Sequence, residues 1–174
     1  MVLDIDFMTL MRDQLPRKTA TFFEKEFEEK SSITLPVNNW SIGLPKAISK
    51  GQNVLNVLFE LFDKTEHITD FSKLPIPFFC IATDVENGSE ILIENGSLPM
   101  ALRASASFPT LLDPFVINDK LLLDGGIANN FPISIMKSKG IDIVIGVNVE
   151  GRLVNKDQLT SVVSILNQIV IYQM

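Results

Sequence analysis

Short apolar runs alternate with stretches of helical hydrophobic spacing along this chain of 174 residues, and this alternation limits the folds open to it. Residues 78–83 form an apolar run rich in β-formers, and residues 141–149 (IDIVIGVNV) form a near-continuous one. Between residues 46 and 63, apolar side chains recur at the spacing of an amphipathic helix. We therefore expect an α/β fold, a layered sheet with flanking helices, in which residues 141–149 form a strand buried on both faces.

Two turn signals predict hairpins. An Asn-Gly pair within residues 85–89 precedes a returning strand at residues 90–93. Residues 118–120 (Asn-Asp-Lys) separate the apolar runs 115–117 and 121–123. Each pair of runs should therefore form two neighbouring strands of the sheet.

Capping residues predict further helices. Ser97 precedes a helix over the segment LPMALRASA, and Asn130 precedes a helix that begins at Pro132. Gly140 would end this second helix at the C′ position. Asp157 opens a last amphipathic helix. The segment before about residue 29 is expected to form helical pieces.

Composition excludes several classes of function. The net charge is −6, and no basic cluster stands out, so we expect no nucleic-acid partner. No apolar stretch approaches the roughly 20 residues of a transmembrane helix, and the N-terminus lacks the basic start of a signal peptide, so the chain by itself is expected to be soluble.

The one cysteine, Cys80, excludes an internal disulfide and lies in an apolar run, where an inert buried thiol is expected. We expect no cofactor and no metal.

The chain has one histidine, and this limits its hydrolytic chemistry. A Ser-His-Asp triad within the chain would have to use His67, which lies in the polar stretch KTEHITDF. No nucleophile motif accompanies this histidine. A solvated or capping role is therefore favoured over that of a catalytic base.

The segment from Leu121 to Pro132 (LLLDGGIANNFP) is the strongest candidate for chemistry. Asp124 ends an apolar strand, and Gly125 and Gly126 follow it. A carboxylate in this position is held rigidly while its oxygens face a cleft, and functional groups gather at the carboxyl ends of strands in α/β sheets. An Asp-Gly pair is also common in ordinary turns, so both interpretations stay open at this point.

Small residues gather in the segment ALRASASFPT, residues 101–110. They would let the end of a helix pack closely on neighbouring backbone, and tight packing is at least as good an interpretation as contact with a substrate. Arg103 could bind an anion, but exposed arginines are frequent on helices, so it is left unassigned.

The succession FSKLPIPFFCIATDVENG followed by GSLPMALRASASFPTLLDPFVINDKLLLDGGIANNFPISIMKSKGIDIVIGVNVEG resembles the C-terminal half of a patatin-like phospholipase. The matching features, in order, are the strand ending in ATD, the small-residue stretch with a following proline, the DGG box, the Asn-Pro helix start and the strand IVIGVNV. The bacterial branch in which the patatin domain is fused to an outer-membrane barrel is the most similar, and this implies an exported or outer-membrane parent.

The resemblance implies lipid acyl hydrolysis by a Ser-Asp dyad. In that family the serine lies in a G-x-S-x-G nucleophile elbow, an upstream glycine-rich loop supplies an oxyanion hole, and the aspartate of the DG[AG] box is the general base. Carried over, the role of general base falls on Asp124, and Gly125 and Gly126 complete the box. Such a dyad needs no histidine, which agrees with the composition.

No G-x-S-x-G occurs in this sequence. Three segments, around Ser41, Ser49 and Ser138, nearly match this motif. None of them follows an apolar strand as a nucleophile elbow must. Ser49, whose segment is the nearest in form, is expected in or next to the helix predicted from residue 46. We therefore expect residues 1–174 to be the C-terminal portion of a single patatin-like domain that lacks its N-terminal strands. Alone it would be inactive and would self-associate, rearrange or bind an N-terminal complement.

Two hypotheses remain. The parent protein is a phospholipase or esterase acting on a lipid or ester substrate, with contact to a membrane surface, and this chain supplies Asp124. Alternatively, the chain is a non-catalytic binding module whose helices, at residues 46–63 and 157–174, offer apolar faces to a partner. The coding sequence upstream of Met1 distinguishes the two, because a serine elbow in frame would favour the first.

Overall fold

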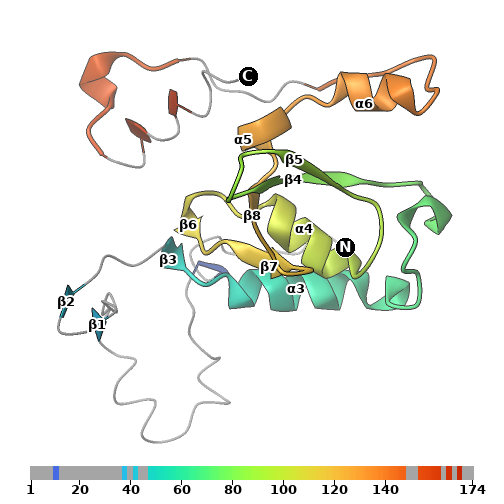
Figure 1. The fold of residues 1–174 in the computed structure, drawn as a ribbon, viewed down its shortest axis with the longest axis horizontal. Helices are drawn as coiled ribbons and strands as arrows, with labels where there is room; N and C mark the ends of the chain where they lie inside the picture. The colour runs from blue at the N-terminus through green and yellow to red at the C-terminus, as the bar shows by residue number, and fades with distance from the viewer. Residues whose placement is uncertain are drawn as a thin grey trace, which may run out of the picture.

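The computed structural model describes residues 47–147 and the short segments 10–11, 37–38, 41–42, 153–161, 164–165 and 168–169. Its main body is a twisted sheet with α-helices packed around it (Figure 1). This mixed arrangement of helices, antiparallel strands and a parallel strand pair confirms the predicted α/β class.

Within the described residues, the main sheet has four strands in the order β5-β4-β8-β7, and all neighbours are antiparallel. The strands are β4 (Cys80–Asp84), β5 (Glu90–Ile93), β7 (Phe115–Ile117) and β8 (Lys120–Asp124). Both predicted hairpins are present. The β7–β8 turn places Asn118 and Asp119 at φ angles of 50° and 62°, which short Asn and Asp side chains tolerate better than most.

Two shorter strand pairs lie outside this sheet. Strands β3 (Ala47–Ser49) and β6 (Thr110–Leu112) are parallel, with Ser49 opposite Leu112. Strands β1 (Val37–Asn38) and β2 (Ser41–Ile42) form an antiparallel pair.

The α-helices of the described body are α3 (Gln52–Phe62), α4 (Leu98–Ser105), α5 (Gly126–Asn129) and α6 (Ile133–Ser138). Single turns of 3-10 helix are η1 (Asp63–Thr65), η2 (Phe71–Lys73) and η3 (Lys156–Gln158). None of the described helices is long and apolar enough to cross a membrane.

Several predicted helix boundaries need correction. The helix predicted from residue 46 begins at Gln52, because residues 47–49 pair with β6 and Gly51 turns the chain at a φ of 72°. Asn130 lies at the C-terminal end of α5, and Pro132 precedes the first residue of α6. Ser97 does precede α4, although its side chain makes no capping bond, and Gly140 follows α6 in the expected left-handed conformation at a φ of 77°.

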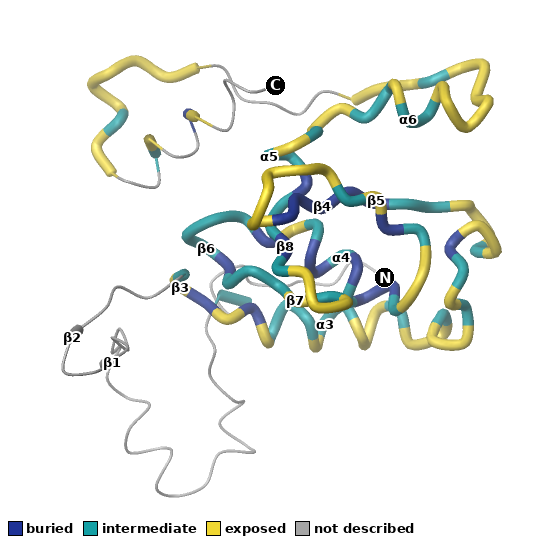
Figure 2. Tube along the Cα trace, viewed as in Figure 1, coloured by how far each residue is buried: buried dark blue, intermediate teal, exposed yellow. Residues whose placement is uncertain are grey.

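The core forms where α4 packs on the sheet. Helix α4 contacts β4, β7 and β8, and α3 packs against α4 along the lower border in Figure 1. Figure 2 shows the buried residues concentrated on β4, α4 and the adjoining strands. The core cluster is mainly apolar, and its members are Phe71, Cys80, Ala82, Ile93, Leu98, Ala101, Ala104 and Leu122.

The buried strand predicted at residues 141–149 is wrong over the part that is described. Residues 141–147 form no strand, and the side chains of Ile143, Ile145 and Val147 are 81%, 88% and 76% exposed. The run is drawn largely in yellow beyond α6 in Figure 2. A near-continuous apolar run becomes a buried strand only when a neighbouring strand pairs with its backbone, and no described strand does so here.

Two other predicted helices lie mostly outside the described residues. Asp157 lies in η3 and does not open a long helix, while helical residues are described at 164–165 and 168–169. The helical pieces predicted before residue 29 fall outside the described residues, except for residue 10, which is helical, and residue 11, which lies in a turn.

Candidate active site

Asp124 is the last residue of β8, and its side chain is half-buried. Its Oδ1 atom accepts a hydrogen bond from the Gly126 N–H at 2.8 Å. Helix α5 begins at Gly126, so the carboxylate lies where a strand ends and a short helix starts. The predicted mounting of this carboxylate, at the carboxyl end of an apolar strand, is therefore present.

Gly125 is required by a close approach of two backbones. A Cβ atom at this position would lie 2.1 Å from the carbonyl oxygen of Ile81 in β4. The Gly125 N–H donates to the carbonyl oxygen of Ser105 at 3.2 Å. The box is also tight at Gly126, where a Cβ atom would lie 3.0 Å from Asp124 Oδ1. Both glycines thus let the chain turn closely around the carboxylate.

The small-residue stretch, which covers the end of α4 and the residues after it, packs against this turn. The Asp124 N–H donates to the carbonyl oxygen of Ser107 at 3.0 Å, and the Ser105 hydroxyl donates to the carbonyl oxygen of Ile81 at 2.6 Å. These contacts favour the packing interpretation of the stretch over direct contact with a substrate. They also bring residues 105–107 beside Asp124, which sequence reasoning did not foresee.

Arg103 is buried, with 1% of its surface exposed, contrary to the expectation for a helix arginine. Its guanidinium donates to the carbonyl oxygens of Lys50 at 2.8 Å and Asp113 at 3.1 Å, and to the Ser107 hydroxyl at 2.6 Å. It also lies over the ring of Phe115, 5.5 Å from its centroid. Arg103 therefore links the residues before α3 to the small-residue stretch. In the sequence, the small residues next to Arg103 were the signal from which its burial could have been predicted.

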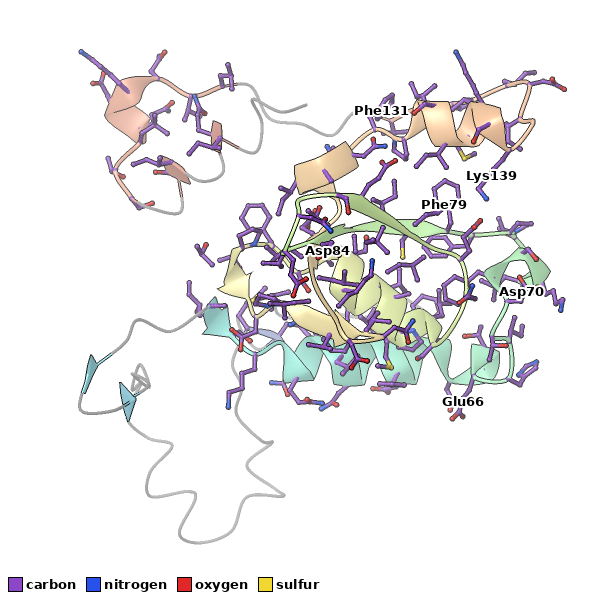
Figure 3. All side chains as sticks on the ribbon, viewed as in Figure 1. Glu66, Asp70, Phe79, Asp84, Phe131 and Lys139 are labelled. Carbon is purple, nitrogen blue, oxygen red and sulfur yellow. The ribbon has the colours of Figure 1, made fainter. Side chains whose placement is uncertain are left out.

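The second strand-end carboxylate, Asp84 of β4, has a structural role. It is 3% exposed, and its Oδ1 accepts the Glu86 N–H at 3.0 Å. Its other oxygen lies 3.5 Å from Lys120 Nζ, at the start of β8. These bonds close the β4–β5 turn and join it to the β7–β8 hairpin; Asp84, the last residue of β4, is labelled in Figure 3.

The segment after Asp124 is bonded to β5 and to Glu94, the residue that follows β5. The Asn129 side-chain amide donates to Glu90 Oε2 at 2.6 Å. Lys139, which follows α6, forms an ion pair with Glu94 and lies over the ring of Phe79, 5.5 Å from its centroid. Figure 3 shows Lys139 reaching toward Phe79. These contacts restrain the course of α5 and α6 after the carboxylate.

The other candidate groups lie in settings that do not favour catalysis. Ser49 ends β3 instead of lying in a helix, but it is 1% exposed and its Oγ accepts the Gly51 N–H at 2.9 Å. The Ser138 hydroxyl donates within α6 to the carbonyl of Ile135. The side chain of Ser41 lies outside the described residues.

His67 and Cys80 also lie in settings that do not favour catalysis. His67 is exposed, as expected. Burial raises the pKa of the Cys80 thiol to about 11, which suits an inert thiol.

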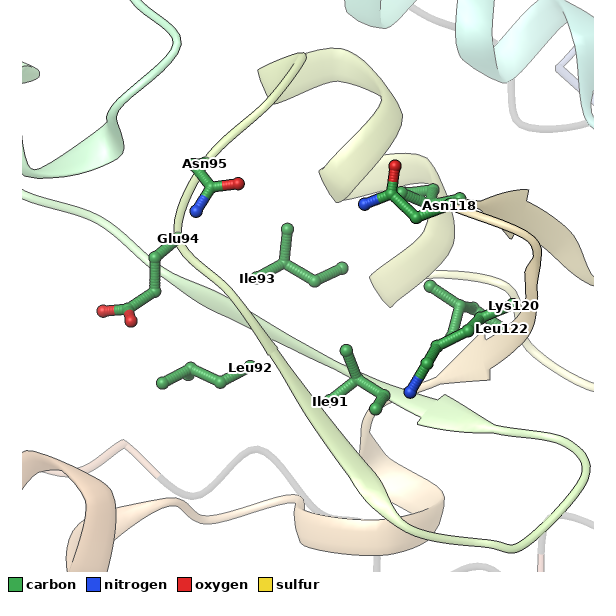
Figure 4. Close-up of a pocket in the computed structure, with 9 residues that line it drawn as sticks. Ile91, Leu92, Ile93, Glu94, Asn95, Asn118, Lys120 and Leu122 are labelled. Carbon is green, nitrogen blue, oxygen red and sulfur yellow. The ribbon is translucent and has the colours of Figure 1, made fainter.

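A hollow of ≈ 210 Å³ lies between β5 and the β7–β8 hairpin (Figure 4). Its lining is mixed apolar and polar, and its members are residues 91–95, 117, 118, 120 and 122. Asp124 is not part of this lining. Within the described part of the chain, no group of three or more His, Cys, Asp or Glu side chains could hold a metal ion.

Burial raises the pKa of the Asp124 carboxyl, and the Gly126 N–H partly offsets this effect. A raised pKa brings a carboxylate closer to the range in which a general base works best at neutral pH. The site thus combines a restrained carboxylate with increased basicity. Chemically, such a carboxylate can accept a proton.

The same pKa shift predicts a pH-dependent stability. A carboxyl with a raised pKa in the folded state favours folding below its ordinary value of 3.8, and this contribution is lost as the pH rises through the folded value. Asparagine keeps the oxygen that accepts the Gly126 N–H but cannot ionise. We therefore expect Asp124→Asn to gain stability relative to the parent chain as the pH rises from about 3 to 7. Urea unfolding across this range measures the difference, and a parent chain that gains on the variant would contradict the shift.

The fold and the site together define an α/β protein with a half-buried carboxylate at a strand end. The model of the patatin-like phospholipase family matches residues 8–137, and the chain belongs to this family. It is 34% identical to lysophospholipase NTE1 of Meyerozyma guilliermondii over 119 residues, which is 68% of this chain and 7% of that protein. The lysophospholipase NTE1 of Scheffersomyces stipitis is 32% identical over 133 residues, 76% of this chain and 8% of the relative.

An NTE family protein of Mycobacterium tuberculosis is 34% identical over 79 residues, 45% of this chain and 22% of its own length. The matched parts thus span less than a quarter of each of these relatives. The predicted family is confirmed. The narrower branch predicted from the sequence, with its barrel-fused parent, stays a prediction.

Proposed function

We propose that this chain supplies Asp124 as the general base of a Ser-Asp dyad in a lipid acyl hydrolase. The observation that carries the proposal is the half-buried carboxylate at the end of β8, whose backbone is held by β4 and by the small-residue stretch. Membership of the patatin-like phospholipase family supports a lipid ester as the substrate. The NTE1 relatives are lysophospholipases by name, which makes lysophospholipids the first substrates to assay.

In the proposed reaction, a serine Oγ attacks the ester carbonyl while its proton moves to the Asp124 carboxylate. The tetrahedral intermediate collapses to an acyl-serine, and the proton passes from Asp124 to the departing alcohol. Water then attacks the acyl-serine, gives its proton to Asp124 and releases the fatty acid, after which the proton returns to the serine. The serine lies outside this sequence, in a parent polypeptide that contains both a G-x-S-x-G elbow and this chain.

The proposal is tested by comparing this chain with the parent polypeptide. A fluorophosphonate probe should label the elbow serine of the parent, and the parent should hydrolyse lysophosphatidylcholine. This chain alone should show neither reaction. Hydrolysis by this chain that is lost on Ser49→Ala would contradict the proposal, because the nucleophile would then lie within the chain.

A second function, as an interaction module, is favoured by the exposed run at residues 141–147. Its backbone is free of described strand partners, and most of its apolar side chains are exposed, which suits addition of a strand from a second copy of this chain. A chain that stays monomeric over a wide range of concentrations would contradict this alternative.

A further inference from the structure

Thr83 connects the two sides of the turn that carries Asp124. This residue lies in β4 with 3% of its surface exposed, opposite Leu123 in β8. Its Oγ1 hydroxyl donates to the main-chain carbonyl of Asp124 at 2.7 Å. The same oxygen accepts the N–H of Ala128, in α5, at 3.2 Å. One side chain of the neighbouring strand thus contacts the backbone before and after the double glycine.

The two hydrogen bonds restrain the part of the backbone that determines where the carboxylate points. The Asp124 carbonyl belongs to the peptide plane between Asp124 and Gly125, so holding this oxygen limits rotation about the Cα–C bond of Asp124. The Ala128 N–H belongs to the first turn of α5 and is shared between two acceptors, the carbonyl oxygen of Gly125 and the Thr83 hydroxyl, each at 3.2 Å. Thr83 therefore caps α5 from a neighbouring strand while it holds the residue that carries the carboxylate.

The other groups that hold this turn are main-chain carbonyls, whereas Thr83 acts through its side chain. The N–H groups of Asp124 and Gly125 donate to the main-chain carbonyls of Ser107 and Ser105. A side-chain substitution at either serine leaves these main-chain bonds available. The hydroxyl of Thr83, in contrast, can be removed with little change of shape, because valine has nearly the same volume.

We propose that Thr83 is a positioning residue for the Asp124 carboxylate, acting through the backbone of the DGG turn without touching the substrate. This inference rests on the proposed function of Asp124 as a general base. It gives Thr83, the threonine of the ATD segment, the task of holding the backbone of Asp124 in place. A small displacement of a catalytic group is costly, since a shift of about 1 Å can reduce the rate of reaction on the order of 100-fold.

The experiment compares Thr83→Val and Thr83→Ser in the parent polypeptide, with lysophosphatidylcholine as the substrate. We expect Thr83→Val to lower kcat by about 10- to 100-fold while KM stays within about twofold, because the substrate does not contact this residue. Thr83→Ser keeps the hydroxyl and should retain kcat within about threefold. Amide hydrogen exchange at Ala128 should be faster in Thr83→Val and unchanged in Thr83→Ser.

Three results would overturn the inference. One is an unchanged kcat in a folded Thr83→Val variant. Another is an equal loss of kcat in Thr83→Val and Thr83→Ser, because the serine variant keeps the hydroxyl and the effect would then come from altered packing at position 83. The third is unaltered exchange at Ala128 in Thr83→Val. If Thr83→Val does not fold, Thr83→Ala takes its place with the same expected results.

The failure of this inference differs from the failure of the proposed function. If Asp124→Asn leaves the parent polypeptide fully active, Asp124 is not the base, and the proposed function is wrong. If Asp124→Asn removes activity while Thr83→Val does not, only the role of Thr83 is wrong. Hydrogen exchange at Ala128, measured on this chain, tests the hydrogen bond itself without any catalytic assay.

Discussion

Asp124→Asn is expected to lower kcat of the parent polypeptide by about 10²–10⁴-fold, the range that a positioned general base contributes. Asparagine has the size of aspartate, and its oxygen can still accept the Gly126 N–H that Asp124 Oδ1 accepts at 2.8 Å. The turn should therefore keep its geometry. What disappears is the ability to take the serine proton, so the loss should fall on kcat with little change in KM.

A matched control is Asp119→Asn. Asp119 lies in the exposed β7–β8 turn at a φ of 62°, a conformation that asparagine tolerates well. The same chemical change at this position should leave kcat within about twofold. Steady-state hydrolysis of lysophosphatidylcholine measures both variants. Equal activity of Asp124→Asn and Asp119→Asn would remove Asp124 from the mechanism.

Gly125→Ala is expected to destabilise this chain by about 3 kcal/mol, at the upper end of what overpacking usually costs. The added methyl group would lie 2.1 Å from the carbonyl oxygen of Ile81, a backbone atom in the middle of the main sheet. The oxygen cannot move aside as the end of a flexible side chain could. Either β4 and β8 separate locally, or the turn rises from the sheet, and the Gly125–Ser105 hydrogen bond is lost in both cases.

The control for this prediction is Gly88→Ala in the β4–β5 turn. Gly88 has a φ of 70°, but a Cβ atom there would find nothing within 4 Å. Its replacement should cost only the left-handed strain, about 1 kcal/mol. Urea denaturation of both variants at pH 7 gives the comparison. A loss of stability in Gly125→Ala no larger than that in Gly88→Ala would mean that the close backbone approach does not constrain this position.

Local patterns predicted the hairpins and the end of α6 because short-range rules decide these features. Asn118 and Asp119 suit the left-handed conformations of a tight turn, and Gly140 suits the residue that follows a helix. In contrast, the start of α3 could not be read from spacing. Ala47 and Ile48 have apolar side chains that suit the helix pattern, yet residues 47–49 pair with β6, which lies some sixty positions further along the chain.

In the candidate site too, some features could be predicted from the local sequence and others could not. The DGG box and its location after an apolar strand were visible in the sequence, so Asp124, Gly125 and Gly126 were found together. The contacts of Thr83 were not visible, because a threonine in an apolar strand has no local mark of a partner forty-one residues away. Arg103 was likewise left unassigned from the sequence, and only the structure shows that its guanidinium is buried among main-chain carbonyls.

The sequence alone determined the family and the hairpins and singled out Asp124 as the candidate carboxylate, because these depend on residue types at short spacing and on motifs in a fixed order. The tertiary structure alone decided which groups hold that carboxylate and which apolar run lacks a partner. The backbone of Asp124 is held by β4 and by the stretch after α4, which the fold brings beside it from separate parts of the chain. The run at residues 141–147 has the composition of a buried strand, but a strand forms only where another backbone supplies its hydrogen bonds.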